Sequence, residues 1–135
     1  MAVATLSLPR IVRFLGTSDG GPSDGKGSAE CPHCGASGRY VHRFQCEDGT
    51  TRGAMSGCIK LFPVHPIASA DMALNERERD LQKRFGPTAS LNTWDKRIRV
   101  AIDAFYAGEM NERTALDQIQ WAQQAKSTYR RSRRR

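Results

Sequence analysis

The feature that most constrains this sequence is a set of four cysteines gathered between positions 31 and 58 of a 135-residue chain. The stretch from Met1 to Leu8 lacks the basic start, long apolar stretch and cleavage site of a secretory signal. No run approaches the ~20 apolar residues that span a bilayer. We therefore expect a cytoplasmic (intracellular) protein without a membrane segment, in which cysteines stay reduced. Under those conditions, cysteines at ligand spacing indicate a metal site rather than two disulfides.

The predicted metal is zinc, which binds four nitrogen or sulfur ligands in a tetrahedron. Two of the cysteines form a C-x-x-C knuckle within CPHCG, where two intervening residues let both thiolates face one ion. The other two are separated by a strand, an Asp48-Gly49 turn and a returning strand. A hairpin returns its ends to near each other, so this pair is expected to join the first. The predicted ligands are Cys31, Cys34, Cys46 and Cys58.

Cys46 is the predicted ligand that has alternatives. If the strand that starts at Arg39 alternates without interruption, His42 and Cys46 share one face. His65 is a further substitute for Cys46, whereas His33 is too constrained inside the knuckle. Cys46 is preferred because it supplies a thiolate. Four protein ligands leave no open position for water or substrate, so the predicted zinc is structural and not catalytic.

The CPHCG knuckle and the later Gly57-Cys58 pair resemble the cysteine motifs of zinc ribbons and treble-clef-like zinc fingers. The resemblance covers about residues 29–60 only. It implies a β-hairpin built around a structural zinc ion. Those folds carry no single function, so the resemblance predicts the module and not its activity.

Composition divides the chain into segments, in this order: an N-terminal strand over 1–16, a flexible linker over 17–30, the zinc ribbon over 31–66, a helical region over 67–129 and a basic disordered tail over 130–135. The linker is dense in glycine, serine and aspartate and has no apolar anchor, so it cannot offset its ordering entropy. The fold class expected from these segments is small α+β.

Three stretches of the helical region carry helix signals. The first runs from near Ser69 to Phe85, the second opens at Asn92, and the third starts after Asn111. Apolar residues recur at helical spacing in the second and third stretches. Because the connection between these two is short, they are expected to form an antiparallel helical hairpin over 92–129.

The formal net charge is +7, and most of the excess lies at the C-terminus, where residues 111–135 carry seven basic against two acidic side chains. Clustered arginines attract phosphates in a salt-sensitive and sequence-independent way. On the ribbon, basic residues alternate with aromatic ones, which suits backbone contact combined with base stacking. The candidate nucleic-acid contacts are Arg39, Arg43, Arg52, Arg130, Arg131, Arg133, Arg134 and Arg135.

The sequence has none of the common catalytic motifs, such as a nucleophile elbow, a phosphate-binding glycine loop or H-E-x-x-H, so we expect no enzyme. The leading hypothesis is a zinc-containing accessory protein, of the kind found in bacteria or phages, that binds the backbone of DNA or RNA. The alternative is an adaptor or inhibitor that docks on a larger complex through its helical hairpin. Trp94 is expected to pack in the core, whereas Trp121 falls off the apolar stripe of its helix and would be the exposed contact for such a partner.

Overall fold

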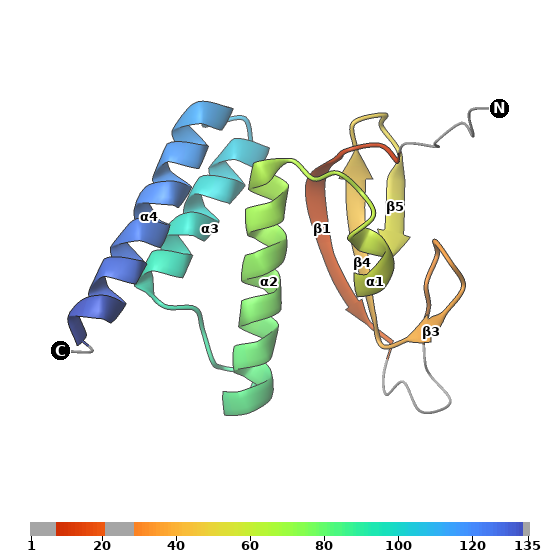
Figure 1. Cartoon of the computed structure of the whole chain (residues 1–135), viewed down its shortest axis with the longest axis horizontal. Helices are drawn as coiled ribbons and strands as arrows, with labels where there is room; N and C mark the ends of the chain where they lie inside the picture. The colour runs from red at the N-terminus through yellow and green to blue at the C-terminus, as the bar shows by residue number, and fades with distance from the viewer. Residues whose placement is uncertain (1–7, 21–28, 134–135) are drawn as a thin grey trace. The chain divides into compact units, whose positions relative to one another are not determined.

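The structure is a computed structural model that describes residues 8–20 and 29–133. The chain divides into two compact units, Met1–His65 and Pro66–Arg135. The first unit holds a three-stranded antiparallel sheet and the second holds three long helices. The predicted small α+β class is therefore confirmed (Figure 1). The division falls one residue before the predicted boundary between ribbon and helices.

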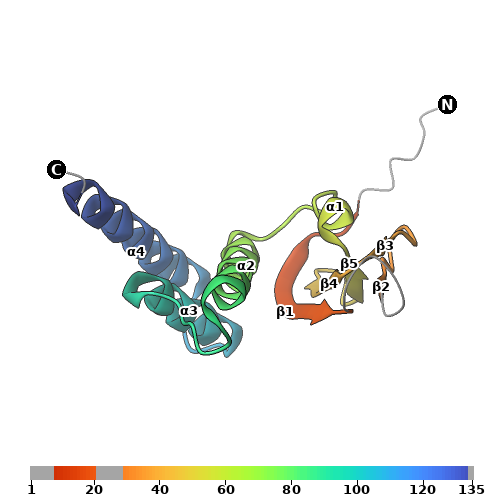
Figure 2. The same ribbon diagram turned by 90° about the horizontal axis from the view of Figure 1, so that it is seen from below.

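The sheet of the first unit has the order β1-β4-β5, with β1 over Ile11–Asp19, β4 over Tyr40–Cys46 and β5 over Thr51–Ala54. β4 and β5 form the predicted hairpin, and Gly49 in its turn has φ +86°, a conformation that favours glycine. The register of β1 against β4 shifts twice, once on each side of Phe14. Such bulges bend a strand, and β1 curves strongly in Figure 2.

A short hairpin and a single helical turn complete the first unit. The hairpin is made of β2, Ala29–Glu30, and β3, Ser37–Gly38, and the turn is α1, Ser56–Ile59. The core of this unit is apolar and includes Phe44, whose ring lies 4.9 Å from that of Phe62 in an edge-on arrangement. Its buried hydrophobic residues are Ile11, Phe14, Cys31, Val41, Phe44, Cys46, Ala54, Ile59 and Phe62.

The predicted linker over 17–30 differs from the structure at both of its ends. β1 continues to Asp19, three residues beyond the predicted strand, because Thr17 to Asp19 pair with β4. The Asp19 carboxylate also accepts two hydrogen bonds from Arg39, at 2.8 and 3.0 Å. At the other end, Ala29 and Glu30 form β2. Positions 21–28 lie outside the described residues.

The second unit contains α2, Pro66–Phe85, α3, Thr93–Tyr106, and α4, Glu112–Arg133. As predicted, Asn92 caps α3, because its side chain accepts a hydrogen bond from the Asp95 backbone N–H at 2.9 Å. Trp94, in the first turn of α3, packs on Tyr129 near the end of α4, with ring centroids 4.8 Å apart. The two helices therefore run antiparallel, as Figure 1 shows.

Both ends of the helical region extend beyond the predicted limits. α2 begins at Pro66 rather than near Ser69, in keeping with the tolerance of a first helical turn for proline. α4 continues through Arg133, so residues 130–133 of the predicted disordered tail are helical, and 134–135 lie outside the described residues. No helix within the described part of the chain is both long enough and apolar enough to span a membrane.

Candidate metal centre

Three of the four cysteines come together in the first unit. The sulfur atoms of Cys31, Cys34 and Cys58 all lie within 4.8 Å of one another. Cys31 is buried, Cys34 is exposed, and Cys58 is intermediate. Three thiols at this separation form a group that can hold a metal ion, because a single ion can contact all three sulfurs.

The knuckle is built by local backbone hydrogen bonds. The Gly35 N–H donates to the Cys31 carbonyl at 2.8 Å, and the Cys31 N–H donates to the Ala36 carbonyl at 2.8 Å. Gly35 has φ +79°, which a residue with a Cβ adopts only at a cost. The β2–β3 pairing closes the loop at Glu30 and Ser37. These contacts hold the first two thiols on the same side of the turn.

The third thiol comes from the segment that follows β5. The Met55 N–H donates to Cys31 Sγ at 3.3 Å, which ties the start of α1 to the knuckle. The Cys58 N–H then donates to the Met55 carbonyl at 3.0 Å within the helical turn. Through Met55, these hydrogen bonds bring the Cys58 segment next to Cys31 in the knuckle.

Electrostatics within the group favour a thiolate at Cys31. Burial raises the pKa of Cys31, but backbone N–H groups of Met55, Cys34 and His33 and the Cys34 thiol outweigh it and lower the pKa to about 7. Hydrogen bonding to Cys34, burial and the neighbouring Cys31 raise the pKa of Cys58 to about 12. One thiolate is thus readily formed at Cys31, and a bound cation would favour ionisation of Cys58 beside it.

Cys46 does not belong to this group, so the structure brings together three of the four predicted ligands. It lies at the end of β4 that leads into the hairpin turn, where its N–H donates to the Thr50 carbonyl at 2.9 Å. β5 then runs back until Ala54 lies opposite His42, so the chain after β5 returns to the other end of β4. The two ends of a hairpin lie opposite its turn. Cys46 lies beside the turn, whereas Cys58 follows the end of the returning strand. Cys46 is 1% exposed, and burial raises its pKa.

The histidines also lie outside the group, and each has its own contacts. His42 is held at both ring nitrogens, with Nδ1 2.7 Å from Thr17 Oγ1 and Nε2 3.0 Å from Ser56 Oγ. His65 is buried, and its N–H donates to the Ile11 carbonyl at 2.8 Å. The His33 ring packs edge-on against Phe62, with centroids 5.5 Å apart.

The arginines predicted on the ribbon differ in their surroundings. Arg39 is paired with Asp19 and lies over the Tyr40 ring, 5.1 Å from its centroid. Arg52 donates to Thr50 Oγ1 at 3.0 Å and reaches Asp48 at 3.4 Å. Arg43 is exposed in the central strand, where its neighbours across the sheet are two glycines, at positions 16 and 53.

The arginines predicted in the tail are placed by α4. Arg130 and Arg131 are exposed on its last turns and line a pocket of the helical unit, and Arg133 is the last residue of the helix. Arg134 and Arg135 lie outside the described residues. The same pocket contains three charged residues that sequence reasoning missed, Arg77, Asp95 and Lys126. Of these three, only Lys126 has a sequence signal, its four-residue spacing from Arg130, which places both residues on one face of a helix.

Comparisons with known proteins give no match: no family model fits the chain, and neither the curated proteins nor the solved structures contain a significant relative.

Proposed function

We propose that the first unit is a zinc-binding module in which Cys31, Cys34 and Cys58 are ligands. The observation that carries this proposal is the mutual approach of three sulfurs to within 4.8 Å. Thiolates are soft ligands that select zinc among the common divalent metals of cells. A small unit with few apolar residues also gains stability from a metal that links its hairpin to the knuckle. The role of the zinc in this proposal is structural.

His42 is the fourth ligand in this proposal. It lies opposite Ala54, near the end of β5 that leads into the Cys58 segment, and its Nε2 is bonded to Ser56, two residues before Cys58. If the hydrogen bond between Nε2 and Ser56 is replaced by a bond to the metal, Nε2 becomes the fourth ligand atom. Nδ1 would keep its hydrogen bond to Thr17, the kind of second contact that orients metal-bound histidines. Three cysteines and one histidine are a ligand set typical of structural zinc.

The function proposed for the whole chain is nucleic-acid binding directed at the backbone. It is supported by exposed positive charge on both units, at Arg43 on the sheet and at Arg130 and Arg131 on α4. Arginine contacts to phosphates release counterions, so affinity should fall steeply as salt rises.

The test is a salt titration with mixed-sequence DNA and RNA, single- and double-stranded, monitored by fluorescence anisotropy. We expect binding at low ionic strength and a linear fall of log affinity with log salt concentration. If none of the four nucleic acids binds at low ionic strength, the proposed function is wrong.

A second candidate function, binding of a protein partner, is favoured by one observation. Trp121 and Val100 are 54% and 64% exposed, and they line a shallow groove of about 420 Å³ between α3 and α4. Lys96 and Arg97 lie beside them, so the complementary partner is a segment with apolar and acidic side chains. This function predicts that Trp121→Ala abolishes partner binding while removal of residues 130–135 preserves it. The nucleic-acid function predicts that removal of residues 130–135 abolishes binding of nucleic acid and that Trp121→Ala preserves it.

A further inference from the structure

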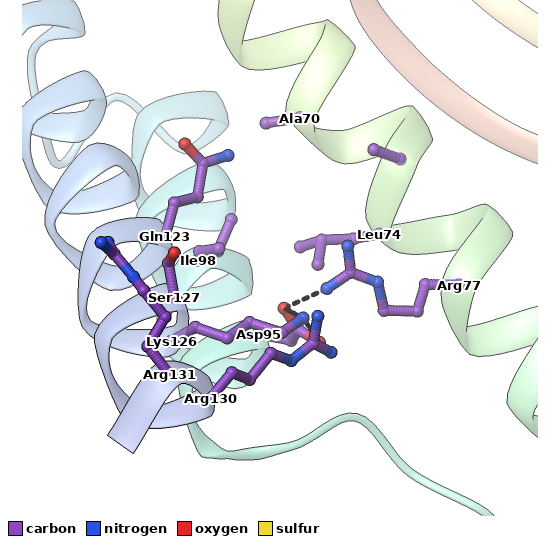
Figure 3. Close-up of a pocket in the computed structure, with 11 residues that line it drawn as sticks. Ala70, Leu74, Arg77, Asp95, Ile98, Gln123, Lys126, Ser127, Arg130 and Arg131 are labelled. Atoms are coloured by element: carbon purple, nitrogen blue, oxygen red, sulfur yellow. Dashed lines mark hydrogen bonds and ion pairs between the residues drawn. The ribbon is translucent and has the colours of Figure 1, made fainter. Parts of the chain in front are cut away.

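The helical unit contains a pocket of about 380 Å³, within the usual size of small-ligand sites. Its lining comes from all three helices of the unit (Figure 3). One wall is apolar and is formed by Ala70, Leu74 and Ile98. Gln123 and Ser127 on α4 supply polar side chains, and the remaining wall is charged.

Positive charge exceeds negative charge in this pocket. Asp95 is the one acidic residue among the described residues that line it. Arg77 contacts Asp95 at 2.7 Å and Lys126 contacts it at 3.1 Å. In Figure 3 the guanidinium of Arg130 points toward the same place, whereas Arg131 extends in the other direction. Three cations thus converge on one carboxylate, which neutralises only one of them.

The pKa of Lys126 is consistent with this excess. Burial lowers it, the Asp95 carboxylate raises it, and the charges of Arg77 and Arg130 lower it further, so that the net direction is down. Positive groups that disfavour one another in this way are stabilised by an added anion.

We propose that this pocket binds the phosphate of a nucleotide unit, with the phosphate at Arg130 and the base against the apolar wall. Arg130 supplies several N–H donors to phosphate oxygens, and Arg77 retains donors beyond the one used by Asp95. Ser127 and Gln123 offer further hydrogen bonds from the same helix. The unit can be a free nucleotide or one nucleotide of a single strand. Binding of one nucleotide of a single strand would assign part of the nucleic-acid contact to this pocket, and it rests on the proposed nucleic-acid function.

The test compares two arginines of α4 that differ in their distance from the pocket. Arg130→Gln removes a pocket cation and leaves the Asp95 contacts in place. Arg113→Gln removes the same charge from an exposed site in the first turn, about 25 Å away along the helix. The probes are a labelled single strand of about ten nucleotides, adenosine monophosphate and inorganic phosphate. Tryptophan fluorescence melts verify that each variant is folded.

We expect Arg130→Gln to weaken binding of the single strand roughly tenfold, as loss of a charged hydrogen bond does. Arg113→Gln should change it less than about twofold, because salt screens charges beyond a Debye length. Adenosine monophosphate should compete better than inorganic phosphate, because it also fills the apolar wall.

The other possible outcomes bear differently on the pocket proposal and on the nucleic-acid function. Single-strand binding that is unchanged in Arg130→Gln overturns the pocket proposal and leaves the nucleic-acid function standing. Binding of adenosine monophosphate that depends on Arg130, with no binding of the single strand, supports the pocket as a site for free nucleotides and overturns its use by one nucleotide of a single strand. If none of the three probes binds to the wild-type chain, the pocket proposal is wrong, and the salt titration with the four nucleic acids decides the nucleic-acid function separately.

Discussion

The Asp95 carboxylate and the Lys126 ammonium face each other across the α3–α4 hairpin, with Nζ 3.1 and 3.2 Å from the two carboxylate oxygens. Both residues are buried, Asp95 at 1% exposure and Lys126 at 8%. Burial of either charge alone is costly, so each makes the burial of the other tolerable. This pair links α3 to α4 beside the proposed phosphate pocket.

Asp95→Asn is expected to lower the free energy of unfolding of the helical unit by about 3 kcal/mol, since it leaves the buried Lys126 without its counter-charge. Urea unfolding monitored by tryptophan fluorescence measures this, because both tryptophans, Trp94 and Trp121, lie in this unit.

The matched control for that change is Asp103→Asn on the same helix. Asp103 is 65% exposed and lies 3.8 Å from Arg99, so its loss should cost less than about 0.5 kcal/mol. The double variant Asp95→Asn/Lys126→Met should recover most of the lost stability, because it removes the unpaired charge. A double variant as unstable as Asp95→Asn would show that the pair matters through shape rather than charge.

Asn92→Ala should destabilise the helical unit by about 1 kcal/mol, because it removes the side chain that accepts from the first turn of α3. Asn92→Asp retains an acceptor and should be nearly neutral. The same unfolding measurement checks both. Equal losses in the two variants would contradict the capping role.

Arg43→Gln should weaken nucleic-acid binding more than Arg39→Gln. The Arg39 guanidinium is already occupied by Asp19, whereas Arg43 stands exposed between two glycine neighbours. Anisotropy titrations at low salt should show roughly a fivefold or greater loss for Arg43→Gln and a smaller loss for Arg39→Gln. The opposite order would place the contact surface elsewhere on the sheet.

His42→Ala should weaken zinc affinity by more than about 10-fold, because loss of even an outer contact of a metal ligand costs that much and here one of four ligands is lost. In the cobalt-substituted protein the visible absorption bands should shift, as expected when a nitrogen ligand is replaced by water. His65→Ala is the control and should leave the bands unchanged. Identical spectra for wild type and His42→Ala would exclude His42 as the fourth ligand.

Local signals in the sequence predicted the local parts of this structure. The Asp48-Gly49 turn and the Asn92 cap involve residues close in sequence, and both are present. The group of three cysteines was only partly predictable from the sequence. In the strand register, the residue pairs next to the turn are those near Cys46, and the last residue of the returning strand, Ala54, lies opposite His42. A hairpin considered only as two joined ends, without its register, does not distinguish the position of Cys46 from that of His42.

Contacts between distant helices could not be predicted in the same way. Trp94 packs on Tyr129 beside the arginine cluster, and α4 continues through Arg133, although composition alone indicated disorder from residue 130 onward. Arg77 belongs to a run of alternating charges typical of a solvated helix face. Its contact with Asp95 depends on how α2 packs against α3, which no pattern within either helix specifies.

Zinc stoichiometry in two cysteine variants tests the central claim most directly. Wild-type protein purified without chelator should contain one zinc per chain by mass spectrometry of the metal. Cys58→Ser should lose it, and Cys46→Ser should retain it, because only Cys58 lies with Cys31 and Cys34. A wild-type chain without zinc, or zinc that is lost in Cys46→Ser and retained in Cys58→Ser, would contradict the account.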